Sequence, residues 1–277
     1  MIKIGAHLSA AKGYMSMIKE MAAMGGNTFQ FFTRNPRGGD AKELNLEDVD
    51  SFLKTLPVYG VTSVLAHASY TINPCSNSPD TRDFAYRTMV DDLKRLSYTP
   101  HQFYNFHPGS HVGQGVDVGI SYICDMLNRV LKPDMTTHIL LETMSGKGSE
   151  IGKSFQELKQ IIDRCEHGHL LGVCLDTCHI YSAGYDIVHR LDDVLEEFDK
   201  TIGLQRLKMI HLNDSLTPFN SRKDRHAKIG EGSIGAEALV RFVNHPTLKH
   251  LPFILETPNE FEGYKKEIAF FRKNFNE

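Results

Sequence analysis

Residues 170–179 read LLGVCLDTCH, an apolar run that ends in an aspartate and is followed by a histidine. A short apolar run of this kind predicts a β-strand, here over residues 170–176. The ionisable side chains of Asp176 and His179 then lie at the carboxyl end of that strand. An apolar run that ends in His, Asp or Glu recurs along the rest of the chain.

Apolar runs alternate with segments of helical period. Strands are predicted over residues 2–8, 27–33, 62–68, 102–107, 137–143, 170–176, 207–213 and 252–257. Helices are predicted over residues 14–24, 46–56, 81–96, 120–130, 155–164, 191–202, 236–243 and 264–274, with N-caps in NLED at 45–48 and SFQE at 154–157. Eight alternations predict an α/β fold, a (β/α)8 TIM barrel over residues 1–277 as one domain. A doubly wound open sheet is the alternative, but no G-x-G-x-x-G motif follows the first strand.

The composition indicates a globular protein, with 41% hydrophobic and 23% charged residues in 277. The apolar runs are too short for a membrane span and the first residues lack a signal-peptide pattern. Five cysteines at irregular spacing indicate reduced thiols, and Cys174 is expected to pack as a small apolar side chain. We therefore expect a cytoplasmic protein. A formal net charge of -3 argues mildly against a generic nucleic-acid binder, but bound divalent ions would add positive charge, so net charge does not decide the partner.

Ligand-type side chains gather at the predicted strand ends, where a barrel forms its active site. They are His7, His67, His107, Glu142, Asp176 with His179, His211 with Asp214, and Glu256, and Asp224 and His226 follow in the long segment 214–235. A charged group at the end of an apolar strand is costly to bury unless it is paired or metal-bound. This mixture of carboxylates and imidazoles suits Zn²⁺ or Mn²⁺, and the number of ligands favours two or three ions with a bridging carboxylate.

The motifs that carry these residues resemble the endonuclease IV family of abasic-site DNA repair endonucleases, over nearly the whole chain. They are GAHLSAAKG at 5–13, LETMSGKGSEIG at 141–152, GVCLDTCHIYSAGYD at 172–186, HLNDS at 211–215, DRHAKIGEGSIG at 224–235 and FILETP at 253–258. The resemblance implies three Zn²⁺ ions per chain, with Mn²⁺ or Fe²⁺ as substitutes. His67 and His107 would hold the first ion, and Glu142 would bridge the first and second. Asp176, His211 and Glu256 would complete the second, and His179, Asp224 and His226 would hold the third.

The resemblance also implies the reaction, which is hydrolysis of the phosphodiester 5′ to an abasic site in double-stranded DNA by a monomer. It leaves a 3′-hydroxyl and a 5′-deoxyribose phosphate. Two close metals can share a hydroxide, formed from a bridging water, that attacks at neutral pH. Glu142 is the residue expected to position this bridging water or to accept a proton from it. His7 and Asp214 fall outside the ligand set and are expected to be structural.

Recognition of the lesion is assigned by the same resemblance to Arg37 and Tyr70, from loops that enter the minor groove. The chain departs from the family pattern in this region. Thr71 stands where a leucine often follows the tyrosine, and Gly38 and Gly39 stand where an aromatic residue is often found. These departures concern DNA penetration and leave the ligand set complete.

Three other functions compete with this interpretation. A sugar isomerase or epimerase of the xylose-isomerase-like type would need Glu142, Asp176, His211 and Glu256, but has no use for the third set of ligands. A non-catalytic barrel would be expected to lack a ligand. Nucleophilic catalysis by Ser110 is weaker, because no G-x-S-x-G motif is present, and GEGSIG at 230–235 is a weak candidate for a phosphate cradle.

Overall fold

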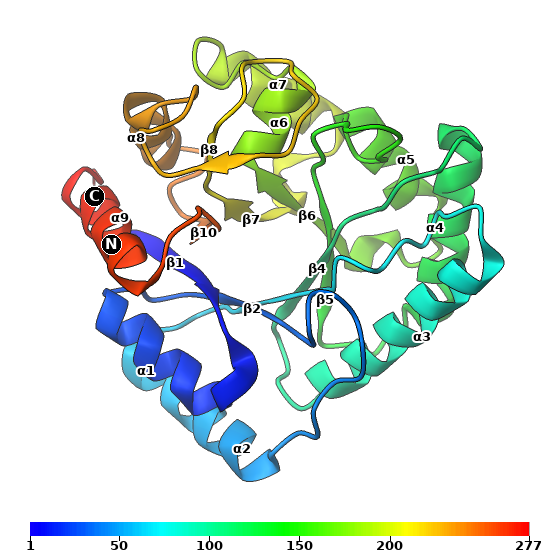
Figure 1. The fold of residues 1–277 in the computed structure, drawn as a ribbon, viewed down its shortest axis with the longest axis horizontal. Coiled ribbons are helices and arrows are strands. Elements are labelled where there is room, and N and C mark those ends of the chain that lie inside the picture. Colours follow the sequence, from blue (N-terminus) through cyan, green and yellow to red (C-terminus); the bar gives the residue numbers. More distant parts are fainter. Residues whose placement is uncertain (277) are drawn as a thin grey trace.

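Eight parallel strands close into a barrel in the computed structural model, which describes residues 1–276 (Figure 1). Around the barrel the order of the strands is β1-β10-β7-β6-β5-β4-β3-β2. Their bounds are β1 Lys3–Leu8, β2 Gln30–Phe32, β3 Leu65–His67, β4 Phe103–Phe106, β5 His138–Glu142, β6 Leu171–Asp176, β7 Leu207–His211 and β10 Pro252–Leu255. The predicted (β/α)8 barrel is confirmed.

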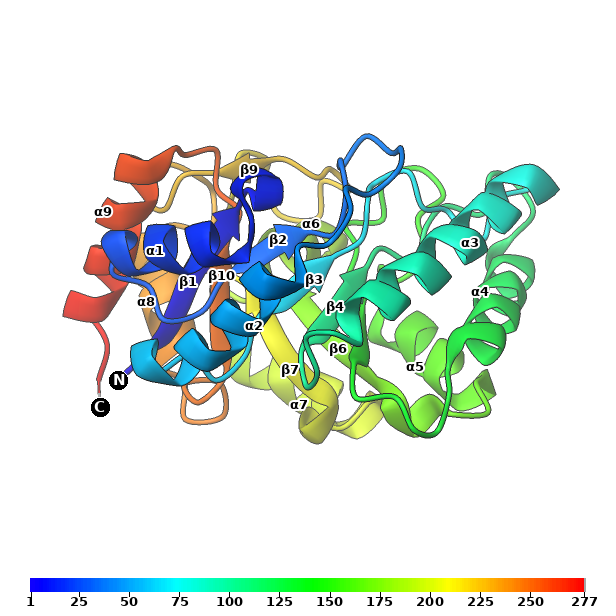
Figure 2. The ribbon, with the colours of Figure 1, turned by 90° about the horizontal axis from the view of Figure 1, so that it is seen from below.

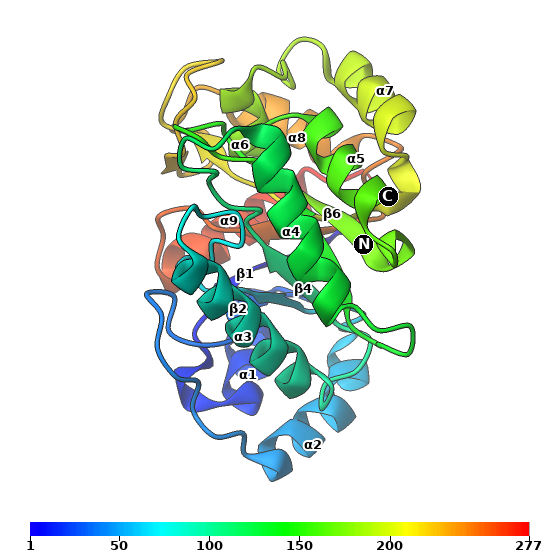
Figure 3. The same ribbon diagram turned by 90° about the vertical axis from the view of Figure 1, so that its right-hand side faces the viewer.

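Helices surround the strands, and Figure 3 shows α3 and α4 lying along the outside of one wall. The bounds are α1 Tyr14–Met24, α2 Leu46–Thr55, α3 Pro79–Leu96, α4 Val116–Val130, α5 Phe155–Arg164, α6 Thr177–Ala183, α7 Leu191–Thr201, α8 Ala236–Asn244 and α9 Phe261–Lys273. Short 3-10 turns occupy Ala10–Lys12, Leu56–Tyr59, Gly168–Leu170 and Leu204–Arg206. No helix within residues 1–276 is long and apolar enough to cross a membrane.

Capping explains several helix starts. The side chains of Asn45 and Ser154 accept hydrogen bonds from backbone N–H groups in the first turns of α2 and α5, as predicted. Ser78 caps α3, which begins at Pro79, earlier than the periodicity predicted. The sequence did not predict α6, because its residues are buried throughout and so show no amphipathic period. Nor did it predict the small antiparallel pair formed by β8, Asp214–Ser215, and β9, His226–Ala227.

The barrel has an apolar interior. Leu65, Leu140, Cys174, Met209 and Ile254, one from each of five strands, form a separate buried cluster, with a larger apolar core outside them. Cys174 therefore packs as a small apolar residue, as expected, and burial raises its pKa to about 12. Because strand side chains alternate between the two faces, the residue two positions after each of these also points inward. The inner apolar layer thus forms a floor beneath the strand ends.

The loops that follow the strands project from one rim, at the upper edge of Figure 2, and both termini lie near the opposite rim. The loop after β2 contains Arg34 near its start, and the Arg34 guanidinium donates to the carboxylate of Asp92 on α3 at 2.6 and 3.0 Å. The hydroxyl of Tyr104 on β4 donates to the other oxygen of the same carboxylate at 2.8 Å. This buried network ties the start of the Arg37 loop to the barrel wall.

Replacing Asp92 with alanine removes the buried partner of Arg34 and Tyr104, so we expect a loss of about 3–5 kcal/mol in the free energy of unfolding. Asp91→Ala is the matched control. Asp91 also pairs with Arg34 but is 51% exposed, and its loss should cost roughly 0–1 kcal/mol. Urea unfolding followed by circular dichroism measures both, and equal losses would contradict the anchoring role of Asp92.

Candidate metal centre

The predicted ligands meet above the apolar floor of the barrel. His67, Glu142, Asp176 and His211 are the last residues of β3, β5, β6 and β7, and His107 and Glu256 follow β4 and β10 directly. Five of them stand two positions after a residue of the inner apolar cluster, so the pleat aims their side chains into the barrel mouth. Strand geometry is therefore what brings together residues far apart in the sequence.

A first group consists of His67, His107 and Glu142, with one potential ligand atom from each within 4.8 Å of the others. Glu142 Oε2 lies 3.2 Å from His67 Nε2 and 3.3 Å from His107 Nε2. The other carboxylate oxygen, Oε1, faces a different neighbour and lies 3.2 Å from Nδ1 of His211. The two oxygens of Glu142 thus serve two adjoining groups, which is the geometry of a bridging carboxylate.

The second group consists of Glu142, Asp176, His211 and Glu256. Nδ1 of His211 lies 3.1 Å from Glu256 Oε2, 3.2 Å from Glu142 Oε1 and 3.8 Å from Asp176 Oδ2. Three carboxylates this close repel one another in a buried environment unless positive charge lies between them. This group has the donors and the electrostatic need for a cation.

A third group lies beside α6 and β9. His179 Nε2 is 3.2 Å and His226 Nε2 is 3.5 Å from Asp224 Oδ1, so the three residues of the predicted set are neighbours. Asp176 also groups with His179 and His226, so it lies between the second and third groups. Cys178 lies near Asp224 and His226 as well, but burial raises the pKa of its thiol to about 12, which disfavours the thiolate that binds metal.

The histidines are held in one orientation by acceptors on their outer nitrogens. His67 Nδ1 lies 2.7 Å from the carbonyl oxygen of Ala68. His179 Nδ1 lies 2.8 Å from that of Thr143, and His226 Nδ1 lies 3.2 Å from that of Glu256. A carbonyl only accepts, so each Nδ1 donates to its carbonyl, and each Nε2 is left facing the carboxylates, where it can bind a cation. Nε2 of His179 and of His226 are buried and make no hydrogen bond, which is what a metal ligand requires.

The charges of the groups depend on one another. Burial by itself raises the pKa of Glu142, but His211 and His107 outweigh burial and hold that pKa well below its usual range. Burial lowers the pKa of His179, but Asp176 and Asp224 raise it well above the ordinary histidine value. The Glu142 carboxylate therefore stays ionised and attracts positive charge into the centre, which protons or metal ions can supply.

Buried carboxamides support the carboxylates from behind. Asn105 Nδ2 donates to Glu142 Oε2 at 2.5 Å, and Asn213 Nδ2 donates to Asp176 Oδ2 at 2.7 Å. Asn213 Oδ1 also accepts from the backbone N–H of Glu256 at 2.9 Å. Sequence reasoning missed both asparagines, because an amide is not a typical ligand. Their position two residues before His107 and two after His211 is the signal that could have identified them.

The structure rules out GEGSIG as a phosphate cradle, and it places Asp214 and His7, the two strand-end residues outside the predicted ligand set. The buried Asp214 carboxylate accepts hydrogen bonds of 2.8–3.2 Å from five backbone N–H groups. Four belong to GEGSIG, those of Gly230, Gly232, Ile234 and Gly235, and the fifth is that of Ser215. These amides are thus occupied by an internal anion and do not form a phosphate cradle. His7 Nδ1 lies 3.5 Å from Glu256 Oε1, so His7 borders the centre.

Tyr70 and Arg37 lie at the rim. Tyr70 is 58% exposed, and its ring centroid lies 5.8 Å from that of His67 and 5.7 Å from that of His107. The two loops are joined, since the N–H of Tyr70 donates to the carbonyl of Pro36 at 3.1 Å. A Cβ added to Gly38, where φ is 94°, would meet Thr71 Oγ1 at 3.1 Å. Gly38 and Thr71, which both depart from the family pattern, therefore pack against each other.

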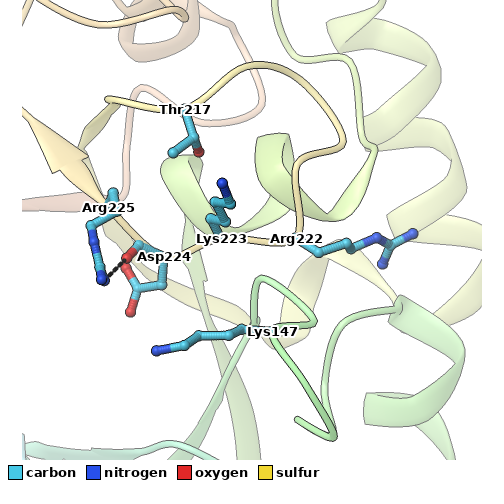
Figure 4. Close-up of a pocket in the computed structure, with 6 residues that line it drawn as sticks. All are labelled: Lys147, Thr217, Arg222, Lys223, Asp224 and Arg225. Carbon is cyan, nitrogen blue, oxygen red and sulfur yellow. Dashed lines mark hydrogen bonds between the residues drawn. The ribbon is translucent and has the colours of Figure 1, made fainter.

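A cavity of about 580 Å³ adjoins the third group and is lined by Lys147, Thr217, Arg222, Lys223, Asp224 and Arg225 (Figure 4). Four of these residues are cationic: Lys147, Arg222, Lys223 and Arg225. Within residues 1–276, none of the four forms an ion pair with a carboxylate. Arg222 adopts a positive φ of 55°, and its N–H is held by the carbonyl of Ser182 at 3.0 Å. In a chain of net charge -3, this is a concentration of unpaired positive charge beside a metal-type site.

Comparison with known proteins identifies the family of the chain. A family model described as a xylose isomerase-like TIM barrel matches residues 18–274, which defines the class of barrel. Probable endonuclease 4 of Alkaliphilus oremlandii is 59% identical over 277 residues, 100% of this chain and 99% of that protein. The crystal structure of endonuclease IV from Thermus thermophilus aligns at a TM-score of 0.87 and 32% identity, over 98% of each chain. The chain belongs to the endonuclease IV family.

More distant structures share the fold. The crystal structure of 3-keto-D-glucoside 4-epimerase from E. coli aligns at a TM-score of 0.66 and 14% identity, over 99% of this chain and 100% of that one. At that identity the likeness concerns the barrel and not its chemistry.

Asp214→Asn keeps the size of the side chain but places an amide NH₂ against backbone donors that now meet a carboxylate. We expect a loss of roughly 2–4 kcal/mol in the free energy of unfolding, because several buried N–H groups lose a charged acceptor. Hydrogen exchange at the amides of Gly230, Gly232 and Gly235 should also accelerate. Unchanged exchange at these glycines would contradict the role given to Asp214.

Proposed function

We propose that this chain is a metal-dependent DNA repair endonuclease that hydrolyses the phosphodiester bond 5′ to an abasic site in double-stranded DNA. The products would be a 3′-hydroxyl and a 5′-deoxyribose phosphate. The observation that carries the proposal is the adjoining set of ligand-type groups in which Glu142 and Asp176 each belong to two groups and Asp224 contacts His179 and His226, beside a cavity lined by cations. Membership of the endonuclease IV family supports the same activity.

The proposed cofactor is three Zn²⁺ ions, one to each group, with Mn²⁺ or Fe²⁺ as possible substitutes. His67, His107 and Glu142 would hold one ion, and Glu142, Asp176, His211 and Glu256 would hold another. His179, Asp224 and His226 would hold the last, with Asp176 beside it. Nitrogen and oxygen donors without thiolates suit zinc in a catalytic site, where ligand positions remain open to water and substrate.

With ions bound, the centre would supply an activated water and positive charge for the phosphate. The chain itself contributes orientation and charge. Glu142 is 1% exposed and presents one oxygen to each of two groups, so it would bridge the ions or take a proton from the attacking water. Asn105 donates to Glu142 Oε2 and so keeps this oxygen turned toward His67 and His107.

The substrate class follows from the surroundings of the centre. Lys147, Arg222, Lys223 and Arg225 would bind DNA phosphates close to Asp224. The exposed ring of Tyr70 stands over His67 and His107, where it could replace the stacking that is lost at an abasic site. Arg37 lies in a neighbouring exposed loop with no ion pair to its guanidinium within residues 1–276, so it would be free to contact DNA.

A sugar isomerase or epimerase remains the second candidate, since such enzymes share the barrel. The second group, Glu142, Asp176, His211 and Glu256, would be sufficient for that chemistry. The third group and the cationic cavity argue for the nuclease, because a small neutral sugar needs neither.

Glu142→Gln tests the reaction with a duplex oligonucleotide that carries one tetrahydrofuran abasic analogue. The wild type should cleave 5′ to the lesion and hold about three zinc ions, whereas the variant should lose metal and lower cleavage on the order of 10³-fold or more. Glu157→Gln is the control, since Glu157 is also a buried carboxylate but accepts from the backbone of Gly152 and Lys153, outside the centre. Intact DNA with a fully metal-loaded wild type would refute the proposal.

Lys147→Gln and Lys223→Gln test the cationic cavity. Each should weaken binding to a duplex whose scissile bond is replaced by a non-hydrolysable linkage, and each should lower the slope of log K against log salt by about 0.9. Lys54→Gln on α2 provides the control, because Lys54 pairs with Asp50 on an exposed helix face. Fluorescence anisotropy between low and high salt measures the slopes, and equal slopes for all three variants would exclude the cavity as a phosphate site.

A further inference from the structure

Gln30 is a buried side chain that reaches the centre without being a ligand. It is the first residue of β2 and is 0% exposed. Its Oε1 lies 2.7 Å from Nε2 of His211, and its Nε2 lies 2.5 Å from Oε1 of Glu256. The same nitrogen lies 2.7 Å from Nδ1 of His7. One amide thus contacts an imidazole and a carboxylate of the second group, and the bordering histidine.

The chemistry of the partners determines the orientation of the amide. An ionised carboxylate only accepts hydrogen bonds, so the NH₂ of Gln30 must face Glu256. The carbonyl oxygen then faces His211 and accepts, which requires the proton of His211 to be on Nε2. The second hydrogen of the NH₂ points to Nδ1 of His7, which accepts it in turn. Turning the amide over would place its oxygen against Glu256.

The consequence for His211 concerns the opposite nitrogen. With Nε2 donating to Gln30, Nδ1 is the nitrogen that would bind a metal ion, and it lies 3.1 Å from Glu256 Oε2 and 3.2 Å from Glu142 Oε1. The consequence for Glu256 is similar. Gln30 engages Oε1 and leaves Oε2 turned toward Nδ1 of His211. Both residues therefore present their free donor atoms to the same point.

We propose that Gln30 is a positioning residue of the metal centre. It selects the His211 tautomer that binds through Nδ1, and it turns Glu256 so that Oε2 binds the same ion. The inference rests on the proposed function in one respect, which is that the second group binds metal. Asn105 and Asn213 each hold one carboxylate, whereas Gln30 couples a carboxylate and an imidazole. A partner of this kind raises the affinity of its ligands for metal.

Gln30→Met tests the proposal by metal binding, without reference to cleavage. Methionine has a similar length and no amide, so one zinc ion should bind roughly 10–100-fold more weakly, measured by competition with a chromophoric chelator. The Co²⁺-loaded variant should also show an altered ligand-field spectrum. Gln102→Met is the matched control, since Gln102 is a buried glutamine before β4 that accepts from the backbone N–H of Val64 at 2.7 Å. It should lower thermal stability and leave zinc affinity unchanged.

Equal zinc affinity in Gln30→Met and the wild type would overturn the proposal, even if abasic-site cleavage is confirmed. Weaker zinc binding would support it, even if the wild type cleaves no DNA, so the two proposals fail separately. A measurement on the unmodified chain covers the case in which Gln30→Met does not fold. Long-range ¹H–¹⁵N spectra of the zinc-loaded wild type should show His211 protonated on Nε2, and a proton on Nδ1 would refute the proposal.

Discussion

The carboxylate of Glu142 is the constraint on which the site depends. It is 1% exposed and stands at the end of β5, above a floor of apolar side chains. A lone charge there would be very costly, so the surrounding residues must neutralise and orient it. Four imidazoles lie within 3.3 Å of its oxygens, and Asn105 donates to one of them. Asp176 and Glu256 lie in the same group as Glu142, so the barrel mouth holds three carboxylates that require positive charge between them.

Strand geometry explains why these groups meet. In a closed parallel barrel all strands end on one rim, and the pleat turns every second side chain inward. Leu140 and Glu142 on β5, and Met209 and His211 on β7, are successive inward positions of this kind. The apolar member of each pair stabilises the barrel, and the polar member enters the centre. The fold is thus both the source of stability and the frame that brings the ligands together.

The loops add a second level of organisation. Asp214 draws together the backbone of residues 230–235, and β9, which carries His226, pairs with β8 beside it. Arg34 fixes one end of the Arg37 loop to α3, and Thr71 packs against Gly38 between the two rim loops. These contacts hold the rim residues in place by internal hydrogen bonds and packing. Within residues 1–276, the cations of the neighbouring cavity have no carboxylate partner and remain free for an anion.

The sequence alone determined the barrel and predicted which strand-end residues meet at its mouth, because alternating apolar runs and strand-end His, Asp and Glu residues are local signals. Helix α6 and the pair of β8 and β9 were not predicted, since buried and two-residue elements leave no periodic pattern. Only the tertiary structure placed Asp176 between two groups and assigned the GEGSIG amides to Asp214. It likewise revealed the amides of Gln30, Asn105 and Asn213 behind the ligands. These facts depend on which atoms meet across the barrel, and no local pattern in the chain encodes such distances.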